Sequence, residues 1–165
     1  MRTQTRSGLD AALRHMPYGI YVVTTITPKG AHGLTASWVM QVSKDPPMVA
    51  VALREASASE RAISAAGAFA VNILAEEDSE MAERFITPVN RFEVPPALNI
   101  KWGLLQLPLL ENALGWLECQ LKSRMETGDH IILIGKVVRG RLNKEDRPLT
   151  TMESGLQYGG LHLED

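Results

Sequence analysis

Cysteine is almost absent from this sequence, since Cys119 is the only one among 165 residues. A single thiol excludes an intramolecular disulfide and a cysteine-rich metal site. An excess of one charge is also missing, because 17 basic and 19 acidic residues leave a formal net charge of -2. Without a basic run or stripe, neither nucleic acid nor an anionic membrane is an expected partner.

Long apolar runs are missing as well, so the sequence predicts no membrane-spanning helix. The first residues, MRTQTRSGLD, lack the apolar centre of a secretory signal, and a cytoplasmic location is the simplest expectation. The remaining composition, 45% hydrophobic and 22% charged, is ordinary for a globular protein. The length predicts one domain, residues 1–165.

Hydrophobic periodicity predicts a mainly β protein with a few short helices. Residues 87–112 are proline-rich and lack a period, which predicts a long loop, and the tail is expected to be irregular. Strict alternation of strands and helices is missing, so an antiparallel barrel or sandwich fits better than a doubly wound sheet. The expected helices cover 7–16, 57–67 and 76–86, and the expected strands cover 19–26, 34–43, 48–53, 68–74, 113–125 and 130–142.

The segment GLTASW, residues 33–38, places small and hydroxyl-bearing side chains in an expected strand. One interpretation is a hairpin strand whose Thr and Ser face lies in water. The other is a binding surface, where backbone groups meet a flat polar ligand and Gly33 permits its close approach.

The segment LREASASERA, residues 53–62, places Ser57 and Ser59 just before an expected helix. Either serine could simply cap that helix. A helix N-terminus also suits a phosphate group, and Arg54 and Arg61 are close by in the sequence.

His130, in the motif GDH, is the histidine with the most informative position. It is either a turn residue or a ligand-binding group at the rim of the barrel. The other histidines are not at metal-ligand spacing, and the sequence contains no nucleophile elbow, Walker loop or GxGxxG motif. No certain catalytic residue is therefore expected.

Seven segments, in one order, resemble the flavin reductase-like family of FMN-binding split-barrel flavoproteins. They are GIYVVTT, GLTASW, SKDPPMVAVAL, the serine pair Ser57 and Ser59, GAFAVNIL, PLLENALGWLEC and GDHIILIGKV. The resemblance implies a six-stranded antiparallel Greek-key split β-barrel with short helices on its rim. It also implies a homodimer that binds FMN rather than FAD near the subunit interface.

The resemblance further implies the site residues. Thr35 to Trp38 would lie along the flavin ring and ribityl chain, the loop that begins at Arg54 would hold the phosphate, and His130 would lie on the nicotinamide side. The flavin-binding residues implied in this way are Thr35, Ala36, Ser37, Trp38, Ala52, Leu53, Arg54, Ser57, Ala58, Ser59 and Arg61.

The implied function is an FMN-binding oxidoreductase that is reduced by NADH or NADPH and passes electrons on. Two positions depart from the reductases: Ala52 stands where they often carry cysteine, and Trp38 where they often carry Ser or Thr. These departures are closer to the flavoredoxin and flavodiiron branch. They leave open an electron-transfer flavoprotein that a redox protein partner reduces, and a binding module without redox activity. The closing segment GLQYGGL, with Tyr158, also resembles the family.

Overall fold

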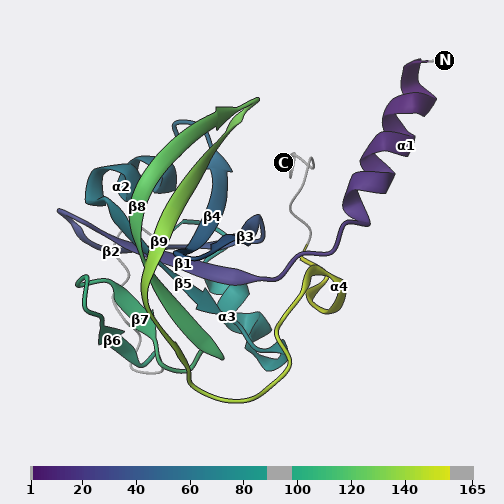
Figure 1. Cartoon of the computed structure of the whole chain (residues 1–165). Coiled ribbons are helices and arrows are strands. Elements are labelled where there is room, and N and C mark those ends of the chain that lie inside the picture. Colours follow the sequence, from purple (N-terminus) through teal and green to yellow (C-terminus); the bar gives the residue numbers. More distant parts are fainter. Residues whose placement is uncertain (1, 89–97, 157–165) are drawn as a thin grey trace.

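The computed structural model describes residues 2–88 and 98–156, with side chains from residue 8 onward. Within these residues seven strands form one antiparallel sheet in the order β2-β1-β5-β8-β9-β4-β3, and β6 pairs with β7 in a separate hairpin (Figure 1). The strands of the sheet are β1 (Tyr21–Thr27), β2 (Gly30–Ala36), β3 (Val39–Lys44), β4 (Pro47–Arg54), β5 (Ala68–Ile73), β8 (Gly115–Thr127) and β9 (His130–Leu142).

The connection between β2 and β3 forces this sheet to close on itself. The two strands are its opposite edges, yet only Ser37 and Trp38 separate them in the chain. Three Cα steps of about 3.8 Å keep Ala36 and Val39 within about 11 Å of one another. The sheet therefore curls into a barrel, and one buried cluster fills it: Val23, Leu34, Ala36, Val49, Val51, Leu53, Ile63, Phe69, Val71, Cys119, Ile131 and Leu133.

The long hairpin of β8 and β9 supplies much of the curvature. Its register shifts between Glu118 and Cys119 and again between Leu121 and Ser123, and such bulges bend and twist a strand. Gly135 lies against the ring of Phe69, because a Cβ at this position would be 2.7 Å from an edge atom of that ring. A larger residue at this position would displace Phe69 from the barrel interior.

Short helices cover the ends of the barrel. The helix α2 (Ala58–Ala66) begins at Ser57, whose hydroxyl accepts the Glu60 N–H at 3.2 Å, and ends at Gly67 with φ 67°. Both ends follow the rules for capped helices. The remaining helices are α1 (Arg2–Arg14), which projects from the barrel in Figure 1, η1 (Glu76–Asp78), α3 (Ser79–Arg84) and α4 (Thr151–Ser154).

Several sequence predictions need correction. The expected strand 34–43 is wrong as a single element, because the chain leaves β1 after Ala36 and pairs with β4 from Val39. The expected count of six strands is also wrong, since the main sheet has seven. The mainly β class with a large antiparallel sheet is confirmed.

The expected loop 87–112 contains the hairpin of β6 (Ile100–Trp102) and β7 (Pro108–Leu110). Buried polar side chains from β5 and β8 hold this hairpin on the barrel. The carboxylate of Glu118 accepts the backbone N–H groups of Leu104 and Leu105 at 3.1 and 2.9 Å. The tail contains the short helix α4, which the sequence did not predict.

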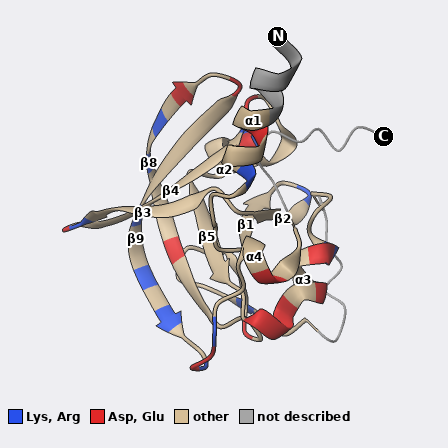
Figure 2. Cartoon of the chain, turned by 90° about the vertical axis from the view of Figure 1, so that its right-hand side faces the viewer, with Lys and Arg blue, Asp and Glu red and all other residues tan. Residues whose placement is uncertain are grey.

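Figure 2 shows acidic residues on α3 and basic residues along β9, and the neighbouring η1 is acidic as well. No helix among the described residues has both the length and the apolar character needed to cross a membrane.

Asn72 should contribute strongly to stability, because it is fully buried and joins β5, β1 and β7. Its amide donates to the Val22 carbonyl at 3.0 Å and to the Thr24 hydroxyl at 3.2 Å, and its Oδ1 accepts the Leu110 N–H at 2.8 Å. We expect Asn72→Ala to lower the free energy of unfolding by about 2–3 kcal/mol, because it leaves buried polar groups unpaired. Urea unfolding measures this.

The exposed Asn99 offers a matched control. Asn99→Ala should change the free energy of unfolding by no more than about 0.5 kcal/mol. Equal effects of the two substitutions would show that the buried amide does not hold β7 on the barrel.

Candidate functional site

The two-residue link Ser37–Trp38 forms one wall of the candidate site. The Trp38 carbonyl accepts the Ala52 N–H at 2.9 Å, which attaches the link to β4 as the chain changes partners. Since β4 ends at Arg54, the link lies beside the residues that precede α2. The structure thus places GLTASW next to the Ala52–Arg54 segment.

The side chain of Ser37 shows a polar group that the described residues do not satisfy. It is 3% exposed, and its Oγ has no hydrogen-bond partner among them. A buried hydroxyl without a partner costs about 1–3 kcal/mol. A polar ligand against the link would supply the missing partner, so this residue fits a flavin at that position.

The neighbouring residues of the link can contribute less than the sequence suggested. Ala36 and Leu53 point into the barrel core, which leaves only their backbone groups for a ligand. The hydroxyl of Thr35 donates to the Ala82 carbonyl at 2.6 Å, and its N–H donates to the Phe85 carbonyl at 2.8 Å. Thr35 therefore fixes α3 to β2 and retains only acceptor capacity for a ligand.

Three ring side chains from distant parts of the sequence meet at the link. The rings of Trp38 and His130 lie 4.7 Å apart between centroids, tilted by 46°. The ring of Tyr18 lies 6.5 Å from Trp38 on a third segment. Two hydrogen bonds tie that segment to α4: the Thr151 N–H donates to the Tyr18 carbonyl, and the Tyr18 N–H donates to the Thr151 hydroxyl.

His130 is more enclosed than a residue on an open rim would be, with only 8% exposure. It opens β9 opposite Arg54 of β4. Its Nδ1 lies 2.6 Å from a carboxylate oxygen of Asp129. The hydrogen bond and the charge of His130, together with Arg54, hold the pKa of the Asp129 carboxyl below its ordinary value.

At the start of α2, the two serines that the sequence analysis grouped together have different environments. Ser57 is half-buried and caps the helix, whereas Ser59 is 1% exposed and its hydroxyl lies 2.8 Å from His32 Nε2 inside the protein. Arg54 and Ala58 are exposed beside Ser57. Arg61 is exposed too, and its guanidinium donates to the Ala56 carbonyl.

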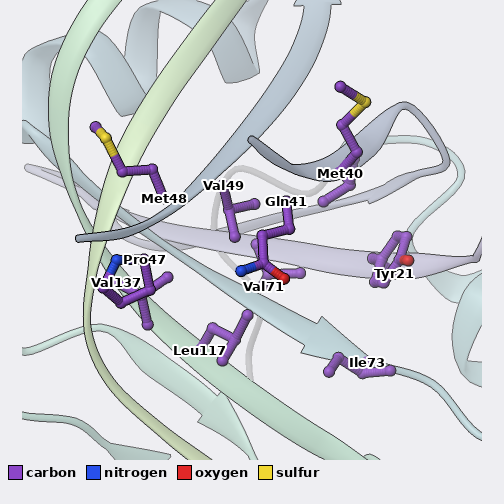
Figure 3. A pocket seen from close by; sticks show the side chains of 11 residues that line it. Tyr21, Met40, Gln41, Pro47, Met48, Val49, Val71, Ile73, Leu117 and Val137 are labelled. Atoms are coloured by element: carbon purple, nitrogen blue, oxygen red, sulfur yellow. The ribbon is translucent and has the colours of Figure 1, made fainter. Parts of the chain in front are cut away.

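A separate hollow of about 290 Å³ opens where β3 parts from β1 and β5. It contains none of the sequence-predicted site residues, and its lining residues are apolar apart from Gln41 and Tyr21. In Figure 3 Met40 extends away from the other lining side chains. The remaining lining residues are Val39, Pro47, Met48, Val49, Val71, Ile73, Leu117 and Val137. Without a cluster of polar groups, this hollow does not suit a flavin ring and its ribityl chain.

The sequence analysis did not predict Tyr18 as a site residue, and from the GDH motif it predicted only His130 and not Asp129. Asp129 follows Gly128, which has φ 39° in the turn between β8 and β9, and a Gly-Asp pair reads as turn chemistry. Tyr18 gave no signal, because only the tertiary fold brings it to Trp38. Tyr158 lies outside the described residues.

Comparison with known proteins decides the family. The family model described as "Flavin reductase like domain" matches residues 13–160. The chain belongs to this family. The predicted resemblance is therefore confirmed.

Relatives and solved structures agree. An NADH:FMN oxidoreductase of Rhodococcus qingshengii is 31% identical over 138 residues, which cover 82% of this chain and 70% of that protein. The styrene monooxygenase flavin reductase of Pseudomonas putida S12 has a structure with a TM-score of 0.77 and 27% identity, over 92% of this chain and 96% of that one. A longer relative from Rhizobium meliloti, named "Probable flavin reductase", is 35% identical over 121 residues, and the match spans 72% of this chain and 38% of that protein.

Proposed function

We propose that this protein is a flavin reductase, which binds FMN and reduces it with NADH or NADPH. The observation that carries the proposal is the convergence of the Ser37–Trp38 link with His130, at 4.7 Å between the rings of Trp38 and His130. Family membership supports the same activity. The expected cytoplasmic location and the single domain remain proposals.

The protein's own part in this reaction is to hold two planar molecules against one another. The flavin, when bound, supplies the redox chemistry, and hydride transfer needs no acid–base residue. We place the flavin ring along residues 35–38, with the Ser37 hydroxyl as a polar contact. A nicotinamide has to reach His130 past Trp38, because His130 itself is almost buried.

An electron-transfer flavoprotein is the second candidate. The two departures from the reductases, Trp38 and Ala52, are bonded to one another in the structure, with the Ala52 N–H donating to the Trp38 carbonyl. Both departures therefore lie at the same point of the site, where the Trp38 ring also packs against His130. A protein partner would then reduce the flavin in place of a nicotinamide.

Anaerobic stopped-flow reduction separates these functions. We expect NADH or NADPH to bleach the FMN-loaded protein, and His130→Ala to slow this reduction at least several-fold. The affinity for FMN should stay near that of the wild type, because His130 seats the nicotinamide and hydride transfer requires the two reacting atoms about 3–3.5 Å apart. If His130→Ala leaves the rate of FMN reduction unchanged, the histidine is only a turn residue and does not bind the nicotinamide. If the wild type binds FMN and neither nicotinamide reduces it, the protein is an electron carrier.

We propose that the FMN phosphate lies at the start of α2, held by Ser57, Arg54 and Arg61. The helix N-terminus offers N–H groups and partial positive charge there. Ser59 supports this turn from inside, through the 2.8 Å contact with His32. This division of roles differs from the pair of phosphate ligands that the sequence suggested.

The preference for FMN over riboflavin tests this placement. A hydrogen bond to a charged group contributes about 1.5–3 kcal/mol, so Ser57→Ala should reduce the affinity ratio of FMN to riboflavin by about 10- to 140-fold. Ser59→Ala should lower the free energy of unfolding and leave the ratio unchanged. The placement is wrong if Ser57→Ala leaves the ratio at its wild-type value.

We also propose that the protein is a homodimer and that a second copy covers the hollow beside β3. Met40 and Val42 of β3 are 65% and 41% exposed at this edge. An exposed apolar patch next to an apolar hollow is typical of a protein interface. The gap between β3 on one side and β1 and β5 on the other would then be closed by the partner.

Light scattering at micromolar concentration should give the mass of a dimer. Met40→Lys should raise the concentration needed for dimerisation at least tenfold, because it places a charge at the centre of the interface. Met152 is 67% exposed on α4, away from the hollow lining, so Met152→Lys is the matched control. A wild type that scatters as a monomer, with FMN bound, would overturn the proposal.

A further inference from the structure

Asp129 differs from an ordinary turn residue in how its side chain and backbone are held. Its carboxylate lies 2.6 Å from Nδ1 of the adjacent His130, which is short for a hydrogen bond of this kind. Its carbonyl accepts the Glu55 N–H at 3.0 Å, which anchors the turn to the chain that follows β4. The Asp129 end of the pair is therefore anchored to the chain that follows β4.

The backbone around His130 is fixed as well. The hydroxyl of Thr127 donates to the His130 carbonyl at 3.0 Å across the turn. His130 pairs with Thr127 on β8 and with Arg54 on β4. With the backbone held on both sides, the remaining freedom of the histidine is the rotation and the tautomer of its ring.

Two contacts of the ring, with Asp129 and with Trp38, bear on both. An ionised carboxylate only accepts hydrogen bonds, so the proton on this side of the imidazole must be on Nδ1. On its face the ring meets Trp38, with centroids 4.7 Å apart. Arg54 also acts on the pair, since its positive charge helps to lower the pKa of the Asp129 carboxyl.

We propose that Asp129 is a positioning residue, which acts through His130 by holding the imidazole in the tautomer with its proton on Nδ1 and in one orientation against Trp38. This inference rests on the proposed function, in which His130 seats the nicotinamide. The tautomer decides the chemistry of the other nitrogen: a neutral ring that carries its proton on Nδ1 has an acceptor at Nε2.

The contrary view is a surface ion pair without consequence. Asp129 has a side chain that is 81% exposed, and exposed pairs contribute little to stability. For the same reason Asp129→Ala should fold, so its effect on the ring can be measured in the native protein. The test is whether the Asp129 carboxylate sets the tautomer and orientation of the His130 ring. A residue that only stabilised the fold would not change the tautomer.

The test combines a spectroscopic and a kinetic measurement on the full chain. In ¹⁵N-histidine-labelled protein, NMR at a pH where His130 is neutral should place the proton on Nδ1 in the wild type. Asp129→Ala should abolish this preference, and Asp129→Glu should restore part of it. Glu126→Gln is the control, because the Glu126 carboxylate lies on the same hairpin, is 79% exposed and pairs with Arg124. This substitution should leave the His130 signals unchanged.

In anaerobic stopped flow, Asp129→Ala should slow the reduction of bound FMN by NADH several-fold, with FMN affinity unchanged. In a His130→Ala background the same substitution should have no further effect, because Asp129 acts only through the histidine. An unchanged tautomer in Asp129→Ala, or an equal slowing with and without His130, would overturn the proposal. If no nicotinamide reduces the wild type, the proposed function fails, and the NMR result alone then decides the role of Asp129.

Discussion

The two-residue link between β2 and β3 is the constraint on which the rest of the structure depends. Ser37 and Trp38 join the opposite edges of a seven-stranded sheet. A link this short brings the two edges together, so the sheet closes around one core and a split is left where β3 turns away. Both the hollow beside β3 and the candidate site begin at this point.

The link also explains why the site needs small residues. Ala36 packs into the barrel core and Ser37 is buried at the turn between two pairings, so there is little room for larger side chains. The change of partner interrupts the regular ladder and leaves the Ser37 hydroxyl without a partner among the described residues. Trp38 then projects toward His130, and the link becomes a wall that a planar ligand can lie against.

Much of the fold could be predicted from the sequence, where local chemistry decides the structure. The β-branched run of β1, the cap at Ser57 and the end of α2 at Gly67 follow local rules, and all are present. The expected strand 34–43 was wrong for a tertiary reason. Its alternation of residue types continues across the link, although the hydrogen-bond partner changes there. A sequence pattern shows which side chains alternate, and it does not show which strand they pair with.

The sequence predicted residues of the candidate site, but not how the tertiary fold arranges them. The resemblance named both Trp38 and His130, but their contact follows from the register of β9 against β4. The sequence also treated Ser57 and Ser59 alike, whereas the helix turns Ser59 inward to His32. The β6–β7 hairpin was missed because Asn72 and Glu118, both distant in the sequence, hold it in place.

A crystal structure of the FMN-loaded protein would test the central claim most directly. The account predicts that the flavin ring lies along residues 35–38, with the Ser37 hydroxyl within hydrogen-bond distance of the flavin and the phosphate at Ser57. A flavin ring in the apolar hollow beside β3, with the Ser37 hydroxyl still unpaired, would contradict it.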